Sequence, residues 1–171
     1  DFSTQAKKQA ALGVRLDVNY YYWPDKWVLN RPGLFTGSGL PMRFSDVDGT
    51  LIDCYQVTTQ LTDESGMDLA FHIRSLLDSA LGASGYYSVI CANMHTDNVP
   101  VQALPGSDII VEEALARNIP VISSRQLLEW IDGRNGSTFT NLRWSGDTLT
   151  FKITAATGSR NMRAMLPLYS N

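Results

Sequence analysis

The residues best suited to chemistry follow a short apolar stretch in the middle of the chain. Residues 86–94 (YYSVICANM) begin with aromatic and β-branched side chains, which is typical of a buried strand. The sequence then turns polar within a few residues, around Asn93, His95 and Asp97. In α/β proteins, catalytic and binding groups usually stand where a buried strand ends. We therefore predict that this strand end forms the rim of a functional site.

His95 has the most specific chemistry in this turn. Imidazole titrates near neutral pH, and a carboxylate within reach, such as Asp97, would hold one tautomer and raise the pKa of the ring, as a general acid requires. The alternative, a neutral imidazole bonded within a turn, stays open. The second histidine, His72, falls in a predicted helix and is expected at its surface or half-buried. Asp63 and Glu64 precede that helix, where carboxylates favour the N-terminus, and a role in a cleft is the alternative.

Two charged residues from other segments are further candidates for the same site. Asp17 stands among apolar residues of a predicted strand, 14–22, and a buried carboxylate must be paired or hydrogen-bonded. Arg15 and Arg43 are its possible partners. We expect the strand that carries Asp17 to end near the same rim as the strand before His95.

Aromatic residues are concentrated at the end of the predicted strand 14–22 and just after it. Tyr22, Trp23 and Trp27 carry flat apolar rings with polar edges, which suit the faces of sugar rings. Because side chains alternate along a strand, some aromatic residues of this region must belong to the core. Together with Asn93, these three are the candidate substrate-binding residues.

Residues 44–52 (FSDVDGTLI) resemble the first motif of haloacid dehalogenase-like phosphohydrolases. In that family Asp46 would be the nucleophile and Asp48 the general acid/base, with a divalent cation between them and the phosphate. The family has an apolar strand before the first Asp, whereas this chain has a proline, an arginine and a serine there. The only lysine after Asp48 is Lys152, in the β-rich end of the chain. The alternative is a DG turn within a β-hairpin.

The pattern of the whole sequence predicts an α/β domain over residues 1–133 and a β-rich segment over 134–171. In the second part, two β-segments resemble a hairpin, and the whole part is too short for a core of its own, so it packs on the first domain or begins a β-sandwich. The expected helices are 3–12, 68–81, 105–118 and 124–132, and the expected strands are 14–22, 40–44, 51–60, 86–94, 119–123, 139–144, 148–154 and 162–167.

The composition fits a folded domain and argues against some partners. Of 171 residues, 44% are hydrophobic and 18% are charged, as in ordinary globular proteins. A net charge of −3 argues against binding nucleic acid, which favours a basic surface, and no apolar run is long enough for a transmembrane helix.

Cys54 and Cys91 fall in predicted strands and are expected to be free thiols, although adjacent strands would permit a disulfide.

The stretch around His95 is similar to the last motif of polysaccharide deacetylases, an aliphatic strand ending in His-Asp and followed by a helix and a strand. Here VICANMHTD supplies the strand and His95, with Asp97 one residue later than usual, and ALPGSDIIVEEALARNIPVIS supplies the helix and the final strand. A wider similarity to large secreted bacterial proteins with a deacetylase-like domain is carried by GVRLDVNYYYWP, RPGLFTGSGLPMRFSDVDG, YQVTTQLTDESG and PVISSRQLLEWIDGRNGSTF. In those proteins a β-sandwich segment follows, and LRWSGDTLTFKI resembles its beginning.

The resemblance implies the C-terminal part of a deacetylase-like β/α barrel that hydrolyses acetyl groups on a glycan. In that family an Asp and two His hold a divalent, zinc-like metal, a His in the last motif is the general acid, and an Arg orients the base. His95 matches the last-motif His, and Arg43 is the best match to the Arg. The acidic motif and the His pair are absent from the 171 residues, so no metal ligand is identified here.

The missing motifs leave two interpretations of the chain. They are expected to precede Asp1 in a longer polypeptide with other domains, secreted or at the cell surface, or they are lost from a domain that no longer catalyses. The alternative function is therefore a non-catalytic carbohydrate-binding or structural module. A phosphohydrolase acting through Asp46 and Asp48 is the third.

Overall fold

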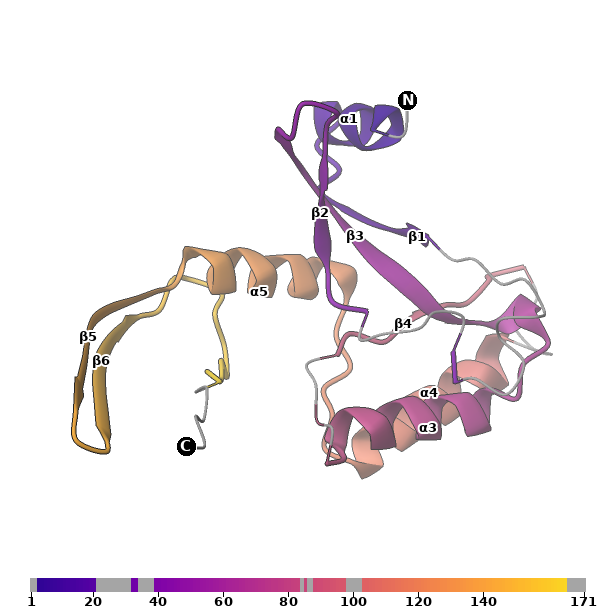
Figure 1. Cartoon of the computed structure of the whole chain (residues 1–171). Helices are drawn as coiled ribbons and strands as arrows, with labels where there is room; N and C mark the ends of the chain where they lie inside the picture. The colour runs from indigo at the N-terminus through magenta and orange to yellow at the C-terminus, as the bar shows by residue number, and fades with distance from the viewer. Residues whose placement is uncertain are drawn as a thin grey trace. The chain divides into compact units, whose positions relative to one another are not determined.

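The computed structural model describes residues 3–20, 32–33, 39–83, 85, 88–97 and 103–165. The chain divides into two compact units, Asp1–Val121 and Ile122–Asn171. Both contain helices and strands, so the mixed α/β class is confirmed, and the strands of the described residues form open sheets without a closed barrel (Figure 1). The second unit includes the last helix as well as the β-hairpin that follows it, whereas the sequence pattern placed the boundary after residue 133.

The first unit is built around β3 (Leu51–Thr62), which pairs with every other strand of its sheet. β1 (Leu16–Tyr20) runs parallel and β2 (Met42–Ser45) antiparallel to the first part of β3. β4 (Cys91–Asn93) runs parallel to its last four residues, with Thr62 opposite Asn93. β-branched and aromatic residues dominate β3, and most of its side chains from Cys54 onward are buried.

The turn between β2 and β3 is the DG turn that the sequence offered as an alternative to a phosphohydrolase motif. The backbone N–H of Asp46 donates to the Thr50 carbonyl at 2.8 Å, and that of Gly49 donates to the Asp46 carbonyl at 3.0 Å. Gly49 has φ +85°, a left-handed conformation that glycine adopts without strain. The chain therefore reverses here into the antiparallel β2–β3 pair.

Helices pack against both parts of β3. α1 (Thr4–Ala11) contacts β3 near its start, and α3 (Leu69–Leu81) connects β3 to β4 in a parallel βαβ arrangement, with α4 (Leu104–Ala116) packed against α3. Asp68 caps α3, because its side chain accepts the N–H of Phe71 at 3.1 Å. The buried residues that form the core beneath α3 and α4 are Leu61, Ile73, Leu76, Leu77 and Ala114.

The strand predicted at residues 119–123 is wrong, because these residues form no ladder with any described strand. Ile119 packs against the core of the first unit, but Val121 and Ile122 are about half exposed. An apolar run of this length carries no periodicity of its own, so its composition could not distinguish a strand from an extended connection.

The second unit combines one helix with a β-hairpin. α5 (Ser124–Gly136) starts with a capping box between Ser123 and Gln126. β5 (Thr138–Ser145) and β6 (Thr148–Thr154) pair antiparallel, which confirms the predicted hairpin. Its two-residue turn begins with Gly146 at φ +56°, as a type II′ turn requires.

The chain after β6 returns to α5. The indole Nε1 of Trp130 donates to the Arg160 carbonyl at 2.9 Å, and a Cβ on Gly133 would lie 2.3 Å from the Ser159 nitrogen, so only glycine fits that close approach. The strand predicted at 162–167 is wrong for its described part, 162–165, which makes no β-ladder. Residues 166–167 lie outside the described residues.

In the described residues both cysteines, Cys54 and Cys91, are free thiols, as expected.

Within the described residues, every helix is too short or too polar to span a lipid bilayer.

The core beneath α3 and α4 should depend most on Leu61, which is fully buried in β3. We expect Leu61→Ala to lower the free energy of unfolding of the first unit by about 3 kcal/mol, through lost apolar burial and the cavity left behind. The matched change Leu51→Ala, at an exposed position of the same strand, should cost less than about 0.5 kcal/mol. Denaturant-dependent hydrogen exchange of the β3 amides measures both, and equal effects would contradict this account of the core.

Candidate functional site

The candidate site lies at the carboxyl ends of β3 and β4. Because these strands are parallel and Thr62 stands opposite Asn93, the residues that follow each strand reach the same edge of the sheet. Asp63 comes directly after β3 and begins a short 3-10 turn, η1 (Asp63–Ser65). His95 comes two residues after β4 ends. The fold thus brings together an aspartate and a histidine that are far apart in sequence.

Asp63 holds His95 through both of its carboxylate oxygens. Its Oδ1 lies 2.7 Å from Nδ1 of the His95 ring, and its Oδ2 accepts the backbone N–H of His95 at 3.1 Å. The Asp63 side chain is only 2% exposed, whereas that of His95 is 37% exposed. A buried carboxylate therefore fixes both the position and the orientation of a partly accessible imidazole.

The same contacts assign the roles of the two ring nitrogens. An ionised carboxylate can only accept hydrogen bonds, so Nδ1 of His95 must carry the hydrogen that it shares with Asp63. Nε2 then remains to bind or release a proton. It lies 3.7 Å from Oε2 of Glu64, whose side chain is about half exposed.

The electrostatics of the pair favour a charged histidine. The hydrogen bond to Asp63, aided by the negative charges of Glu64 and Asp97, raises the pKa of His95 above its ordinary value of 6.5, against a smaller opposing effect of desolvation. Burial by itself would raise the pKa of Asp63, but the hydrogen bonds from the His95 side chain and backbone together outweigh it and lower that pKa below 3.8. A histidine that holds its proton near neutral pH and presents it at Nε2 is suited to general-acid chemistry.

The two other candidates from the His95 turn lie near the pair. Asn93 is the last residue of β4 and is exposed. Asp97 is also exposed and acts on His95 only through its charge, whereas Asp63 makes the direct contact. The carboxylate expected beside His95 is therefore present, but it comes from another strand.

Asp17 and Arg43 are not brought to His95. Asp17 stands opposite Gln56 of β3, and the span from there to Thr62 is roughly 20 Å at the rise of a strand. It is buried, and it accepts hydrogen bonds from the side chains of Gln5 and Gln9 at 3.1 and 3.0 Å.

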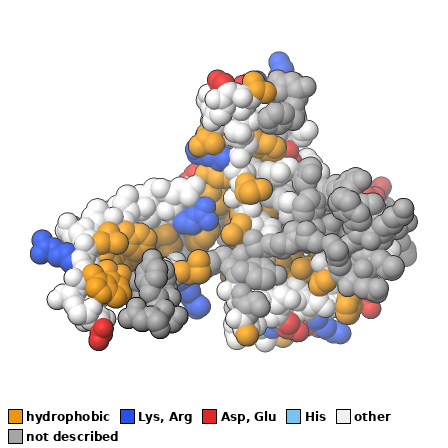
Figure 2. Space-filling model, viewed as in Figure 1, with side chains coloured by type: hydrophobic (Ala, Val, Ile, Leu, Met, Phe, Trp, Pro, Cys, Tyr) orange, Lys and Arg blue, Asp and Glu red, His pale blue; other side chains and the backbone are white. Residues whose placement is uncertain are grey.

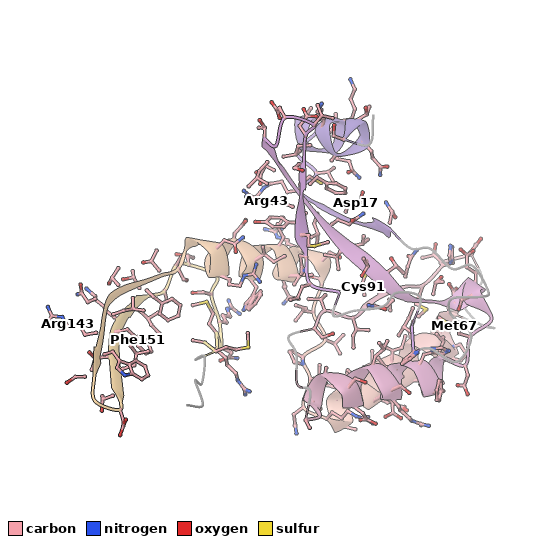
Figure 3. The ribbon with its side chains drawn as sticks, in the orientation of Figure 1. Asp17, Arg43, Met67, Cys91, Arg143 and Phe151 are labelled. Carbon is pink, nitrogen blue, oxygen red and sulfur yellow. The ribbon has the colours of Figure 1, made fainter. Side chains whose placement is uncertain are left out.

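Arg43 pairs with the first part of β3. It stands opposite Tyr55, its guanidinium lies 5.0 Å from the centre of the Tyr55 ring, and Nη2 is 3.2 Å from Asp53. Arg15 bonds to the same carboxylate at 2.8 Å. These residues stabilise the β1–β3–β2 region, where Figure 3 labels Asp17 and Arg43.

The phosphohydrolase residues and the second histidine have local partners. Lys7, whose Nζ lies 2.6 Å from Asp46, is the main cause of a pKa of about 2 for that carboxyl, and the backbone N–H of Thr50 donates to Asp48 at 2.9 Å. His72 is half-buried, as expected, and its Nδ1 accepts the N–H of Gly33 at 2.8 Å. Burial lowers its pKa.

The three aromatic candidates, Tyr22, Trp23 and Trp27, lie outside the described residues. The described residues contain no group of three or more His, Cys, Asp or Glu side chains that could hold a metal ion. The Asp63 carboxylate binds Nδ1 of His95, so the pair offers Nε2 of His95 as a single metal ligand, fewer than the three protein ligands that a zinc-like metal needs.

Comparisons with protein-family models, with curated proteins and with solved structures give no match. The Asp63–His95 pair is therefore the feature from which a function is inferred.

The sequence alone does not identify Asp63 as the partner of His95. Its position before a predicted helix suggested a favourable charge at the N-terminus, with a cleft role as the alternative. The sequence does contain one signal of a shared site: Asp63 directly follows a long β-rich segment, and His95 follows another within two residues. Two strands that run parallel would bring both residues to one edge, but only the pairing of β3 with β4 establishes this.

The pair predicts a defined pH dependence. His95 has a raised pKa in the folded state, so its contribution to stability is present below pH 6.5 and is lost as the pH rises through the higher folded value. Asp63 has a lowered pKa, so its contribution is present above pH 3.8 and is lost as the pH falls through the lower folded value. Thermal melting should show the pair at full strength between about pH 4 and 6.5.

Titration by NMR tests the assignment directly. The His95 ring should titrate above 6.5 in the native chain, and Asp63→Asn should bring its pKa down, because the amide cannot stabilise the imidazolium as a carboxylate does. His72, which should titrate below 6.5 in both, is the internal control. An unchanged His95 pKa in Asp63→Asn would show that the carboxylate does not hold the ring.

Proposed function

We propose that this chain is part of a carbohydrate-active domain, related to polysaccharide deacetylases, in which His95 is the general acid of acetyl-group hydrolysis. The observation that supports the proposal is the buried Asp63 carboxylate on Nδ1 of His95, at the carboxyl edge of a parallel β3–β4 pair. The parallel β3–α3–β4–α4 order is consistent with a segment of a β/α barrel. The secreted or cell-surface location and the further domains of a longer polypeptide belong to the same proposal.

In this proposal the proton moves at Nε2 of His95. When the bond between the acetyl carbon and the sugar nitrogen or oxygen breaks, the leaving group takes up a proton, and the imidazolium supplies it. Asp63 keeps the ring charged before the transfer and holds Nε2 at the exposed side. Glu64 lies close enough to Nε2 to influence that proton, and Asn93 stands at the same edge.

The divalent metal implied by the family would polarise the acetyl carbonyl and activate water. The residues described do not form a site for it, so its ligands would lie elsewhere in the polypeptide. Tyr22, Trp23 and Trp27 remain the proposed sugar-stacking residues.

A specific observation also favours a non-catalytic role. Asp63 bonds to the backbone N–H of His95 as well as to its ring, so the pair ties together the ends of β3 and β4 whether or not it transfers a proton. In a carbohydrate-binding or structural module, the pair would be needed for stability alone.

Acetate release from acetylated glycans separates these functions. In the full-length polypeptide, we expect His95→Gln to lower kcat by about 10² to 10⁴, the usual contribution of a general acid, and Asp63→Asn to lower it less while shifting the pH profile downward. The matched control His72→Gln should keep native kcat, because His72 lies in α3 and its Nδ1 accepts the backbone N–H of Gly33.

The outcomes assign the role of the pair. Activity that survives His95→Gln removes His95 from the mechanism. Glycan binding without acetate release, with both variants lowering the melting temperature but not the affinity, supports the non-catalytic module.

A further inference from the structure

The β5–β6 hairpin has one apolar face and one polar face. The apolar face is formed by six large side chains, Phe139, Leu142, Trp144, Leu149, Phe151 and Ile153, and we call it the hairpin face. Phe139 stands opposite Ile153 and Trp144 opposite Leu149. Figure 3 shows Arg143 and Phe151 pointing to opposite sides of the hairpin, and Figure 2 shows hydrophobic side chains gathered there.

A bulge at Asn141 creates this face. Phe139 and Trp144 are an odd number of residues apart, so in a regular strand they would point to opposite sides. The ladder shifts register between Thr140 and Arg143, and Asn141 between them has φ +55°. The extra residue places both aromatic side chains on the hairpin face. The inserted residue thus gathers apolar side chains on one face of a sheet that has only two strands among the described residues.

The hairpin face is exposed. Five of its residues, all except Leu149, have exposed fractions between 39% and 66%. A two-stranded hairpin is marginally stable in water unless another layer covers its apolar side. With roughly 200 Å² per large side chain, the exposed part amounts to about 500 Å², at the upper end of what monomers leave uncovered.

We propose that the hairpin face binds the same face of a second copy of this chain. Two such faces would bury about 1,000 Å² in total, the lower limit for a specific interface. The hairpin face contains no charged group, so two copies meet without repulsion. Stacked face to face, the hairpins form a four-stranded, two-layer sandwich in which each supplies the missing layer of the other.

Other partners fit this face less well. The Phe139 and Phe151 rings meet edge to face at 63°, so a flat sugar chain cannot stack on both. The cations Arg143 and Lys152 stand on the opposite face, so an anionic polymer or an anionic lipid surface would be drawn to the polar side.

Sedimentation velocity of the 171-residue chain, over a concentration range from about 1 to 500 μM, tests the proposal. We expect a concentration-dependent monomer–dimer equilibrium. Leu142→Lys should weaken it at least tenfold, because each dimer would bury two unpaired ammonium groups. Thr148→Lys, the same charge on the polar face, should leave it unchanged.

A second measurement covers the case in which Leu142→Lys fails to form the hairpin. Hydrogen exchange of the native β5 and β6 amides should slow as the concentration rises, because the dimer stabilises a marginal hairpin. A native chain that stays monomeric throughout, larger assemblies that do not stop at two, or an equal dimer in Leu142→Lys would each overturn the proposal. Exchange independent of concentration would show that the chain covers its own hairpin face.

Discussion

The first unit depends on the hydrogen-bonded ladder of β3. Within the part of the chain that the structure describes, each of the other strands in this sheet pairs with β3, and none of them pairs with another. The first part of β3 is held by β1 and β2, and the last four residues are held by β4. Any change of register in β3 would therefore move every strand of the sheet at once. This single strand positions both the structural carboxylates at one end and the candidate site at the other.

The two ends of β3 use carboxylates in different ways. At the start, Asp53 is shared by Arg15 and Arg43 near the surface, and Asp17 is satisfied by two amide side chains of α1. These contacts hold β1, β2 and α1 in place. At the carboxyl end, a buried Asp63 binds an imidazole instead, and their hydrogen bond raises the pKa of His95. Asp17 and Asp63 are both buried, so the partner of each carboxylate, rather than its burial or residue type, distinguishes the candidate site from the other end of β3.

Local signals predicted local structure well. The DG turn at Gly49, the hairpin pattern of residues 139–154 and the helical pattern of residues 68–81 all act within a few residues, and they correspond to the β2–β3 turn, the β5–β6 hairpin and α3. The errors at 119–123 and 162–165 have one cause, because a strand needs a partner and composition does not supply one.

The candidate site also combines a feature that the local sequence predicts with one that it does not. His95 could be singled out from its own neighbourhood, but its carboxylate partner could not. Asp97 is near in sequence, whereas Asp63 is near in space because β3 and β4 run parallel. The same topology leaves Asp17 and Arg43 at the other end of β3. Contacts between distant segments are decided by strand pairing, which one sequence does not reveal.

β4 has only three residues, and its brief ladder with β3 is extended by the bond from Asp63 to the His95 backbone. The element that presents the imidazole is therefore among the least anchored strands of the sheet. Short strands of this kind detach locally far more often than the whole unit unfolds. Each such detachment would separate His95 from the Asp63 carboxylate and lower the pKa of the imidazole toward its ordinary value. The raised pKa of His95 and the closure of the β3–β4 edge are thus coupled, so a ligand that bridged the two strand ends would stabilise both.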